Sequence, residues 1–238
     1  MALSGSCPGT LFAQMAAGVH TGFYALNGAV IGGIVYTGFI SRNLADRRQA
    51  LKLKGEATSI HTQLGIPRAA AIVLFEAAFV AIIAATTLYT PRFPGTKIPG
   101  AVGGLLIGLS QLFSLFTRRS MVGISGSYEE IGNLFWWRVK GEQQTKPKSL
   151  QNVLFAVSAG LGAFILAKLV PEFAARPAFE ATPVLATLGG ALMVIGARLA
   201  GGCTSGHGIS GISLLSTSSV ITIASTFAAG AVIANLVY

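Results

Sequence analysis

The chain has 238 residues, of which 52% are hydrophobic and 11% are charged, and its mean hydropathy is +0.66. Soluble domains carry about 25% charged residues, so the composition excludes an ordinary soluble domain and predicts an all-α, polytopic helical membrane protein. The net charge of +9 does not indicate nucleic-acid binding, because the basic residues lie in loops between apolar runs, where the positive-inside rule places them.

The apolar runs predict six spans in a single transmembrane domain that covers residues 1–238. A spanning helix needs about 20 apolar residues to cross about 30 Å of hydrocarbon. The predicted spans are residues 20–40, 69–90, 100–117, 152–170, 182–200 and 218–238. Three shorter or glycine-broken segments are expected to enter the membrane without crossing it, at residues 6–18, 120–134 and 201–216.

The loops between these spans predict an orientation. Loops 41–68 and 118–151 hold six basic residues each, whereas turns 91–99 and 171–181 hold two and one. Alternate loops lie on the same side of the membrane, so both basic loops are predicted to be cytoplasmic, and the membrane is predicted to be the plasma membrane.

Glu76 stands well inside the second apolar run. A charge at such a depth costs about 2.5–3.5 kcal/mol on insertion scales. We therefore expect this side chain to face the helix bundle or to be protonated, and a helix–helix hydrogen bond would explain it as well as a transport pathway would.

The segment Ser4–Thr10, with the sequence SGSCPGT, predicts a first polar break. Pro8 suits the first turn of a helix, so we expect a short helix over Pro8–Ala17 with Cys7 as its N-cap. The helix dipole favours negative charge at that position, and Ser6 and Gly9 flank the thiol as candidate binding residues. A free cysteine also serves as a small buried hydrophobic residue.

Residues Met121–Glu130, with the sequence MVGISGSYEE, form a second break. The motif GISG occurs at Gly123–Gly126 and again at Gly208–Gly211, each time after a span that begins with a glycine pair. This weak internal repeat fits the duplicated architecture of many transporters. Ser125, Ser127 and Tyr128 could line a path here, although an interfacial loop would explain the segment equally well.

The third break, Gly201–Gly211, reads GGCTSGHGISG and contains five glycines. It separates two apolar runs, and unpaired backbone groups in hydrocarbon cost several kcal/mol each. Such a break is stable only inside protein or beside a wet cavity, so we predict a substrate site here. A helix expected to begin near Gly211–Ile212 would present N–H groups to an anion. Further donors or charge would come from Thr204, Ser205, Ser210 and Arg198.

Cys203 and His207 lie in this third break and leave several interpretations open. On a helix, their four-residue spacing could hold a metal ion, but Gly206 and Gly208 argue against helical structure here. Two ligands are too few for a closed tetrahedral zinc site, and we predict no metal site and no cofactor; Cu(I) is a weaker alternative. A Cys–His nucleophile pair is a further alternative, and His207 could simply fix the loop by a hydrogen bond.

The run GARLAGGCTSGHGISG, Gly196–Gly211, resembles the signature of the YeeE/YedE family of sulfur-transport membrane proteins, and SGSCPGT resembles a second loop of that family. The resemblance implies thiosulfate uptake through the cytoplasmic membrane, by S–H hydrogen bonds from relay thiols. Those thiols would be Cys7 and Cys203. The residues that would shape one loop around the ion are Gly202, Ser205, Gly206 and His207.

The chain also departs from this family. Members usually have further spans and a further loop before the SGxCPGT segment, and three relay thiols rather than two. We therefore expect that an upstream segment or another chain completes the pathway, or that the pathway in this chain is incomplete. A cytoplasmic sulfur-acceptor protein or a second copy of the chain would be the partner. The alternatives are a membrane sulfurtransferase that carries a cysteine persulfide, and an accessory subunit of a transporter.

Overall fold

The computed structural model describes residues 1–52, 59–89, 98–141, 146–147, 149–174 and 180–237. Every regular element in these ranges is helical, and one isolated β-bridge joins Ser59 to Ser216. This confirms the all-α prediction. Some residues used for the sequence predictions lie outside the described residues, namely the span ends at 90 and 238 and the basic residues Lys54, Arg92, Lys97, Lys148 and Arg176.

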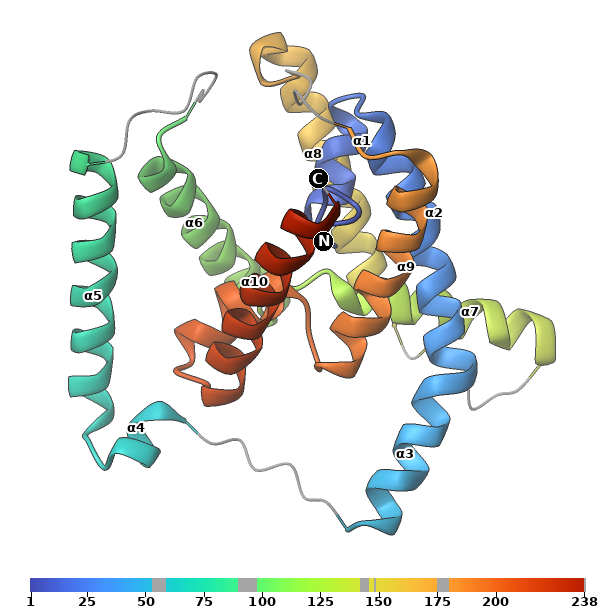
Figure 1. Ribbon diagram of the computed structural model, residues 1–238, viewed down its shortest axis with the longest axis horizontal. Helices are drawn as coiled ribbons and strands as arrows, with labels where there is room; N and C mark the ends of the chain where they lie inside the picture. Colours follow the sequence, from blue (N-terminus) through green and yellow to red (C-terminus); the bar gives the residue numbers. More distant parts are fainter. Residues whose placement is uncertain (53–58, 90–97, 142–145, 148, 175–179, 238) are drawn as a thin grey trace.

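Figure 1 shows the arrangement of the helices. In chain order they are α1 (Thr10–Ala16), α2 (His20–Val35), η1 (Tyr36–Ile40), α3 (Ser41–Ala50), α4 (Ile60–Leu64), α5 (Arg68–Tyr89), α6 (Gly100–Arg118), α7 (Ser125–Lys140), α8 (Gln151–Leu169), η3 (Pro171–Ala174), α9 (Pro183–Leu199), η4 (Ser205–Gly211) and α10 (Thr217–Val237). The elements η1 and η4 are π-helical, whereas η3 is a 3₁₀ turn.

Five of the described helices are long and apolar enough to cross a membrane. They are the continuous helix His20–Arg47, which joins α2 to most of α3, and helices α5, α6, α8 and α10. Helix α9 is apolar but has only 17 residues, and it starts with Pro183 at its first turn. Most side chains of α5, α6, α8 and α10 are exposed, as expected for helices that face lipid in an integral membrane protein.

Helices α2 and α9 run side by side and form the most closely packed pair of the fold (Figure 1). A Cβ atom on Gly28 would overlap the Thr187 carbonyl oxygen, and one on Gly32 would lie 2.6 Å from the Ala191 carbonyl oxygen. Glycine lets two backbones approach closely in lipid, where burial of apolar surface does not drive helices together. This pair positions the end of α9, from which the third break begins.

Candidate functional site

The three predicted breaks meet at Gly9. A Cβ atom built on this residue would lie 3.7 Å from Ile124 Cδ1, 3.8 Å from Cys7 Sγ and 3.9 Å from Ser205 Oγ. Close by, a Cβ on Gly123 would lie 3.8 Å from Gly206 Cα. The fold therefore brings the segments 4–10, 121–128 and 201–211 into contact, although they are far apart in the sequence.

Cys203 is buried in this junction, with 4% of its surface exposed. Its sulfur lies 2.9 Å from the Ser205 hydroxyl. It also interacts with the backbone N–H of Gly206 and with the hydroxyl and backbone N–H of Ser125. Ser125 is the first residue of α7, so the positive end of that helix dipole points at the thiol. These donors create an environment that favours an anion or a polarisable sulfur atom.

Cys7 is half-buried and lies in a turn that is held by Thr10. The Thr10 N–H and hydroxyl both donate to Cys7 Sγ at 3.4 Å, and the Cys7 N–H donates to Thr10 Oγ1 at 2.9 Å. The Cys7 carbonyl also accepts the N–H groups of Thr10 and Leu11. The structure assigns α1 to Thr10–Ala16 with Gly9 as N-cap, so the short helix begins two residues after the predicted start at Pro8. The bonds of Cys7 to Thr10 and Leu11 are nevertheless those of a helix N-cap.

Most of the third break is helical, so the prediction that Gly206 and Gly208 prevent a helix here was wrong. Residues Ser205–Gly211 form the π-helix η4, which begins six residues before the helix expected near Gly211. The reversal after α9 occurs instead at Gly201, which has φ +85°, a conformation that glycine adopts at little cost. Gly211 serves packing, since a Cβ there would overlap the Ser219 hydroxyl.

His207 connects the two ends of this break. Its Nε2 lies 3.2 Å from the Ala200 carbonyl oxygen, and its Nδ1 lies 2.9 Å from Ser219 Oγ. A carbonyl oxygen only accepts, so Nε2 carries the proton and Nδ1 accepts from the Ser219 hydroxyl when the ring is neutral. The ring packs against Gly202, where a Cβ would lie 3.1 Å from Nε2. The imidazole thus holds the loop around Cys203.

Each thiol lines a cavity of its own. A cavity of about 340 Å³ lies between α9, α10 and the N-terminal segment, and Gly202, Cys203 and Thr204 line it. A second cavity, of about 620 Å³, is lined by Ser6, Cys7 and other residues of the first break and α1. The junction at Gly9 joins the segments that carry the two thiols.

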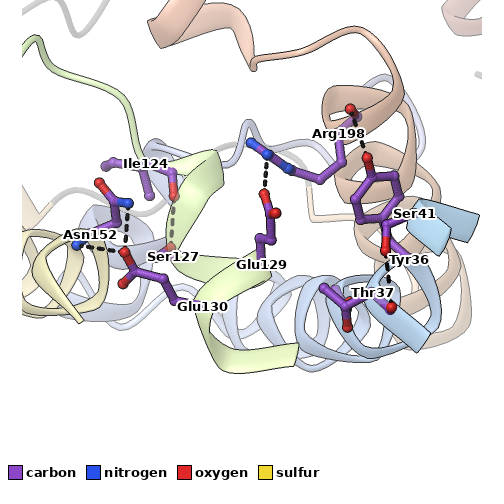
Figure 2. Close-up of polar contacts among 10 residues, drawn as sticks. Tyr36, Thr37, Ser41, Ile124, Ser127, Glu129, Glu130, Asn152 and Arg198 are labelled. Carbon is purple, nitrogen blue, oxygen red and sulfur yellow. Dashed lines mark hydrogen bonds and ion pairs between the residues drawn. The ribbon is translucent and has the colours of Figure 1, made fainter. Parts of the chain in front are cut away.

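Arg198 forms an ion pair with Glu129 of α7 (Figure 2). The Tyr36 hydroxyl donates to the Arg198 carbonyl at 3.4 Å, and the guanidinium lies 6.0 Å from the centre of the Tyr36 ring. The positive charge that was predicted to attract an anion is therefore compensated by a carboxylate. Glu129 was not among the predicted site residues; the signal was a pair of adjacent acids, Glu129 and Glu130, in a chain with only eight acidic residues.

Glu130 connects α7 to α8 (Figure 2). Its carboxylate accepts the Asn152 side-chain amide at 2.7 Å, the Asn152 N–H at 3.3 Å and the Val153 N–H at 3.0 Å. These two N–H groups belong to the first turn of α8, where helix geometry leaves them without intrahelical acceptors. The two adjacent glutamates thereby fix α7 against α9 on one side and α8 on the other, which fixes Ser125 beside Cys203.

Tyr128 fixes the first break to α7. Its side chain is fully buried, and its hydroxyl donates to the Pro8 carbonyl oxygen at 3.1 Å. We expect Tyr128→Phe to lower the free energy of unfolding by about 1–2 kcal/mol, because the buried Pro8 carbonyl loses its donor. The thermal unfolding midpoint in detergent measures this, with Tyr24→Phe, at an exposed tyrosine of α2, as control. An equal midpoint for wild type and Tyr128→Phe would contradict this role.

Comparison with known proteins identifies relatives that are described as transporters. A protein of Xylella fastidiosa strain 9a5c described as a probable transporter is 32% identical over 123 residues, which cover 52% of this chain and 82% of that protein. A probable transporter of strain Temecula1 gives the same values. The thiosulfate transporter TsuA of Spirochaeta thermophila is 28% identical over 234 residues, which cover 92% of this chain and 68% of TsuA.

The family profile described as Sulphur transport matches residues 1–233, which is nearly the whole chain. The match includes both cysteine-bearing segments on which the resemblance was based, and it confirms that resemblance. The protein therefore belongs to the Sulphur transport family of YeeE/YedE proteins.

Proposed function

We propose that this protein passes thiosulfate, or a related small sulfur oxyanion, across the membrane through a constriction between the Cys7 and Cys203 cavities. The contact of both thiol-bearing segments around Gly9 is the observation that carries this proposal. The similarity to TsuA, a thiosulfate transporter, supports thiosulfate as the substrate. The membrane would be the plasma membrane, with loops 41–68 and 118–151 on the cytoplasmic side. Residues 120–134 of the second loop would re-enter the membrane, and a sulfur-acceptor protein in the cytoplasm would be a partner.

The donors around the constriction suit such an ion. The backbone N–H groups of Ser125 and Gly206 and the Ser205 hydroxyl would bind its oxygen atoms, as neutral donors at a helix N-terminus bind anions elsewhere. The thiols are weak S–H donors and polarisable groups, which suits the terminal sulfur atom. Neutral donors bind an anion without trapping it, and conduction requires that the ion can leave.

The test is uptake of labelled thiosulfate into liposomes that contain the purified chain. We expect Cys203→Ala to lower the uptake rate about 10- to 100-fold, because a hydrogen bond to a charged group contributes about 1.5–3 kcal/mol. Cys203→Ser retains a donor but lacks the soft sulfur atom, so its rate should be intermediate. Ser110→Ala is the control, since that exposed hydroxyl bonds only within α6.

Two outcomes of this experiment would contradict the proposal. Unchanged uptake by Cys203→Ala would exclude the thiol from the pathway. A mass increase of one sulfur atom on Cys203 after exposure to a sulfur donor would instead indicate a membrane sulfurtransferase, because passage by hydrogen bonds leaves no covalent adduct. Intact-mass measurement of the same preparation decides between these mechanisms.

A further inference from the structure

Helix α5 contains a single charged residue between Arg68 and Tyr89, which is Glu76. It lies eight residues after Arg68, which places it about 12 Å along a helix of about 33 Å. Because the hydrocarbon core is about 30 Å thick, the carboxyl group lies within it. A carboxylate is costly there, and an ionisable residue inside a membrane indicates a functional site.

The side chain of Glu76 faces the third break. A cavity of about 170 Å³ separates α5 from the segment that contains η4. The lining includes Phe75, Glu76 and Phe79 of α5, and Gly208, Ile212 and Ser213 on the opposite side. The region around Glu76 is therefore mostly apolar, and its opposite wall is formed by η4 and the residues after it. Helix η4 begins at Ser205, two residues after Cys203.

Glu76 is the one titratable side chain among the described residues that line this cavity. The nearest candidates on the elements packed against it are Arg68 at the start of α5, His61 on α4, and His207 on η4, whose ring is bonded to Ser219 and Ala200. Among the described residues, none forms a hydrogen bond or an ion pair with Glu76. A negative charge on this carboxyl group would therefore have no partner among these residues.

A short chain of hydrogen bonds connects the far wall of this cavity to the thiol junction. Ser213 Oγ donates to the Ser210 carbonyl at 2.8 Å, and Ser210 Oγ donates to the Val122 carbonyl at 2.8 Å. Gln111 connects η4 to the second break, since its side-chain amide donates to Ser210 Oγ and its side-chain carbonyl accepts the Val122 N–H. A displacement of η4 caused by a charge on Glu76 would therefore reach the segment that leads into Ser125.

We propose that Glu76 is a proton-binding site that couples anion passage to proton entry. This inference rests on the proposed function. The carboxylate would take up a proton from the outer side to give a neutral carboxylic acid that packs against η4, and it would release the same proton to the inner side. An anion that enters a cell works against the inside-negative potential, and each accompanying proton cancels one negative charge.

The experiment compares two modes of transport in liposomes, with the membrane potential clamped. Net uptake of labelled thiosulfate should respond to an imposed proton gradient, with about tenfold more accumulation per pH unit if one proton accompanies each anion. Exchange of labelled for unlabelled thiosulfate moves no net proton. We expect Glu76→Gln, which imitates the protonated form, to lose the response to the gradient and to continue exchange, whereas Glu76→Asp retains the response.

A pH-sensitive dye inside the vesicles gives an independent readout on the wild type, whose interior should acidify as thiosulfate enters. Thr86→Val, which removes an exposed hydroxyl elsewhere on α5, is the matched control and should respond as the wild type does. Wild-type exchange without any effect of the proton gradient would overturn this inference and leave the proposed function intact. Absence of exchange in folded wild type would overturn both.

Discussion

Replacing Gly28 with alanine is expected to destabilise the fold more than any other single methyl addition in α2. The new Cβ would overlap the Thr187 carbonyl oxygen, and a backbone oxygen in a helix cannot rotate away as a flexible side chain would. Helices α2 and α9 would have to separate along their whole contact. Overpacking costs about 1–3 kcal/mol and occasionally more, and we expect the upper end here. The measurements are the yield of monodisperse protein and its thermal unfolding midpoint in detergent.

Gly103→Ala is the matched control for this substitution. In the described part of the chain, no atom beyond the local turns of α6 lies within 4 Å of the Cβ position at Gly103. Alanine also favours a helix over glycine by about 1 kcal/mol. Its unfolding midpoint should therefore be unchanged or higher. Wild-type stability of Gly28→Ala would show that the α2–α9 contact is not as close as this structure has it.

The same comparison shows what sequence reasoning could predict. Glycine pairs open two predicted spans, at Gly103–Gly104 and at Gly189–Gly190, and they read alike in the sequence. The second pair is packed, because a Cβ on Gly190 would overlap the Ala25 carbonyl oxygen. A Cβ on either glycine of the first pair would have no described residue of another element within 4 Å. The length of an apolar run can be read from a local stretch of sequence, so the membrane helices could be predicted. Which glycine contacts another helix depends on which helices pack together, and the sequence of one chain does not show this.

The site was predictable to a similar extent. The glycine-rich breaks with cysteine indicated which segments form the site, because unpaired backbone groups in hydrocarbon are costly unless protein or water surrounds them. The helical form of η4 was missed, since glycine lowers helix propensity by only about 1 kcal/mol per residue and tertiary packing, such as that of Gly211 on Ser219, outweighs it. The role of Ser125 beside Cys203 was also not predicted, because the contact joins residues 78 positions apart in the sequence.

Arg198 allows two interpretations, and they predict different double variants. As an anion-binding residue, its charge acts directly on thiosulfate. As a positioning residue, it neutralises Glu129 and so holds the N-terminus of α7 beside Cys203. Arg198→Gln should lower uptake under either interpretation. It should also lower the free energy of unfolding by about 2 kcal/mol, because the side chains are 19% and 34% exposed and the cost falls between that of an exposed and of a buried pair.

The double variant Arg198→Gln/Glu129→Gln separates the two interpretations. Removing both members of an ion pair leaves no unpaired charge and is often close to neutral, so we expect the unfolding midpoint to recover. We also expect uptake to recover to within a few-fold of wild type, because the ion pair positions α7 and the neutral donors bind the anion. Arg138→Gln, at an exposed arginine in the last turn of α7, removes the same charge and should leave both readouts unchanged.

A different result from the double variant would indicate that Arg198 binds thiosulfate directly. If the double variant regained its stability but transported no better than Arg198→Gln, the loss of uptake could not come from misplacement of α7. The guanidinium would then have to leave Glu129 and contact thiosulfate during passage, and the Glu129→Gln single variant should bind thiosulfate more tightly, because the competing carboxylate is gone. The apparent affinity of that variant therefore distinguishes the two roles of Arg198 without reference to stability.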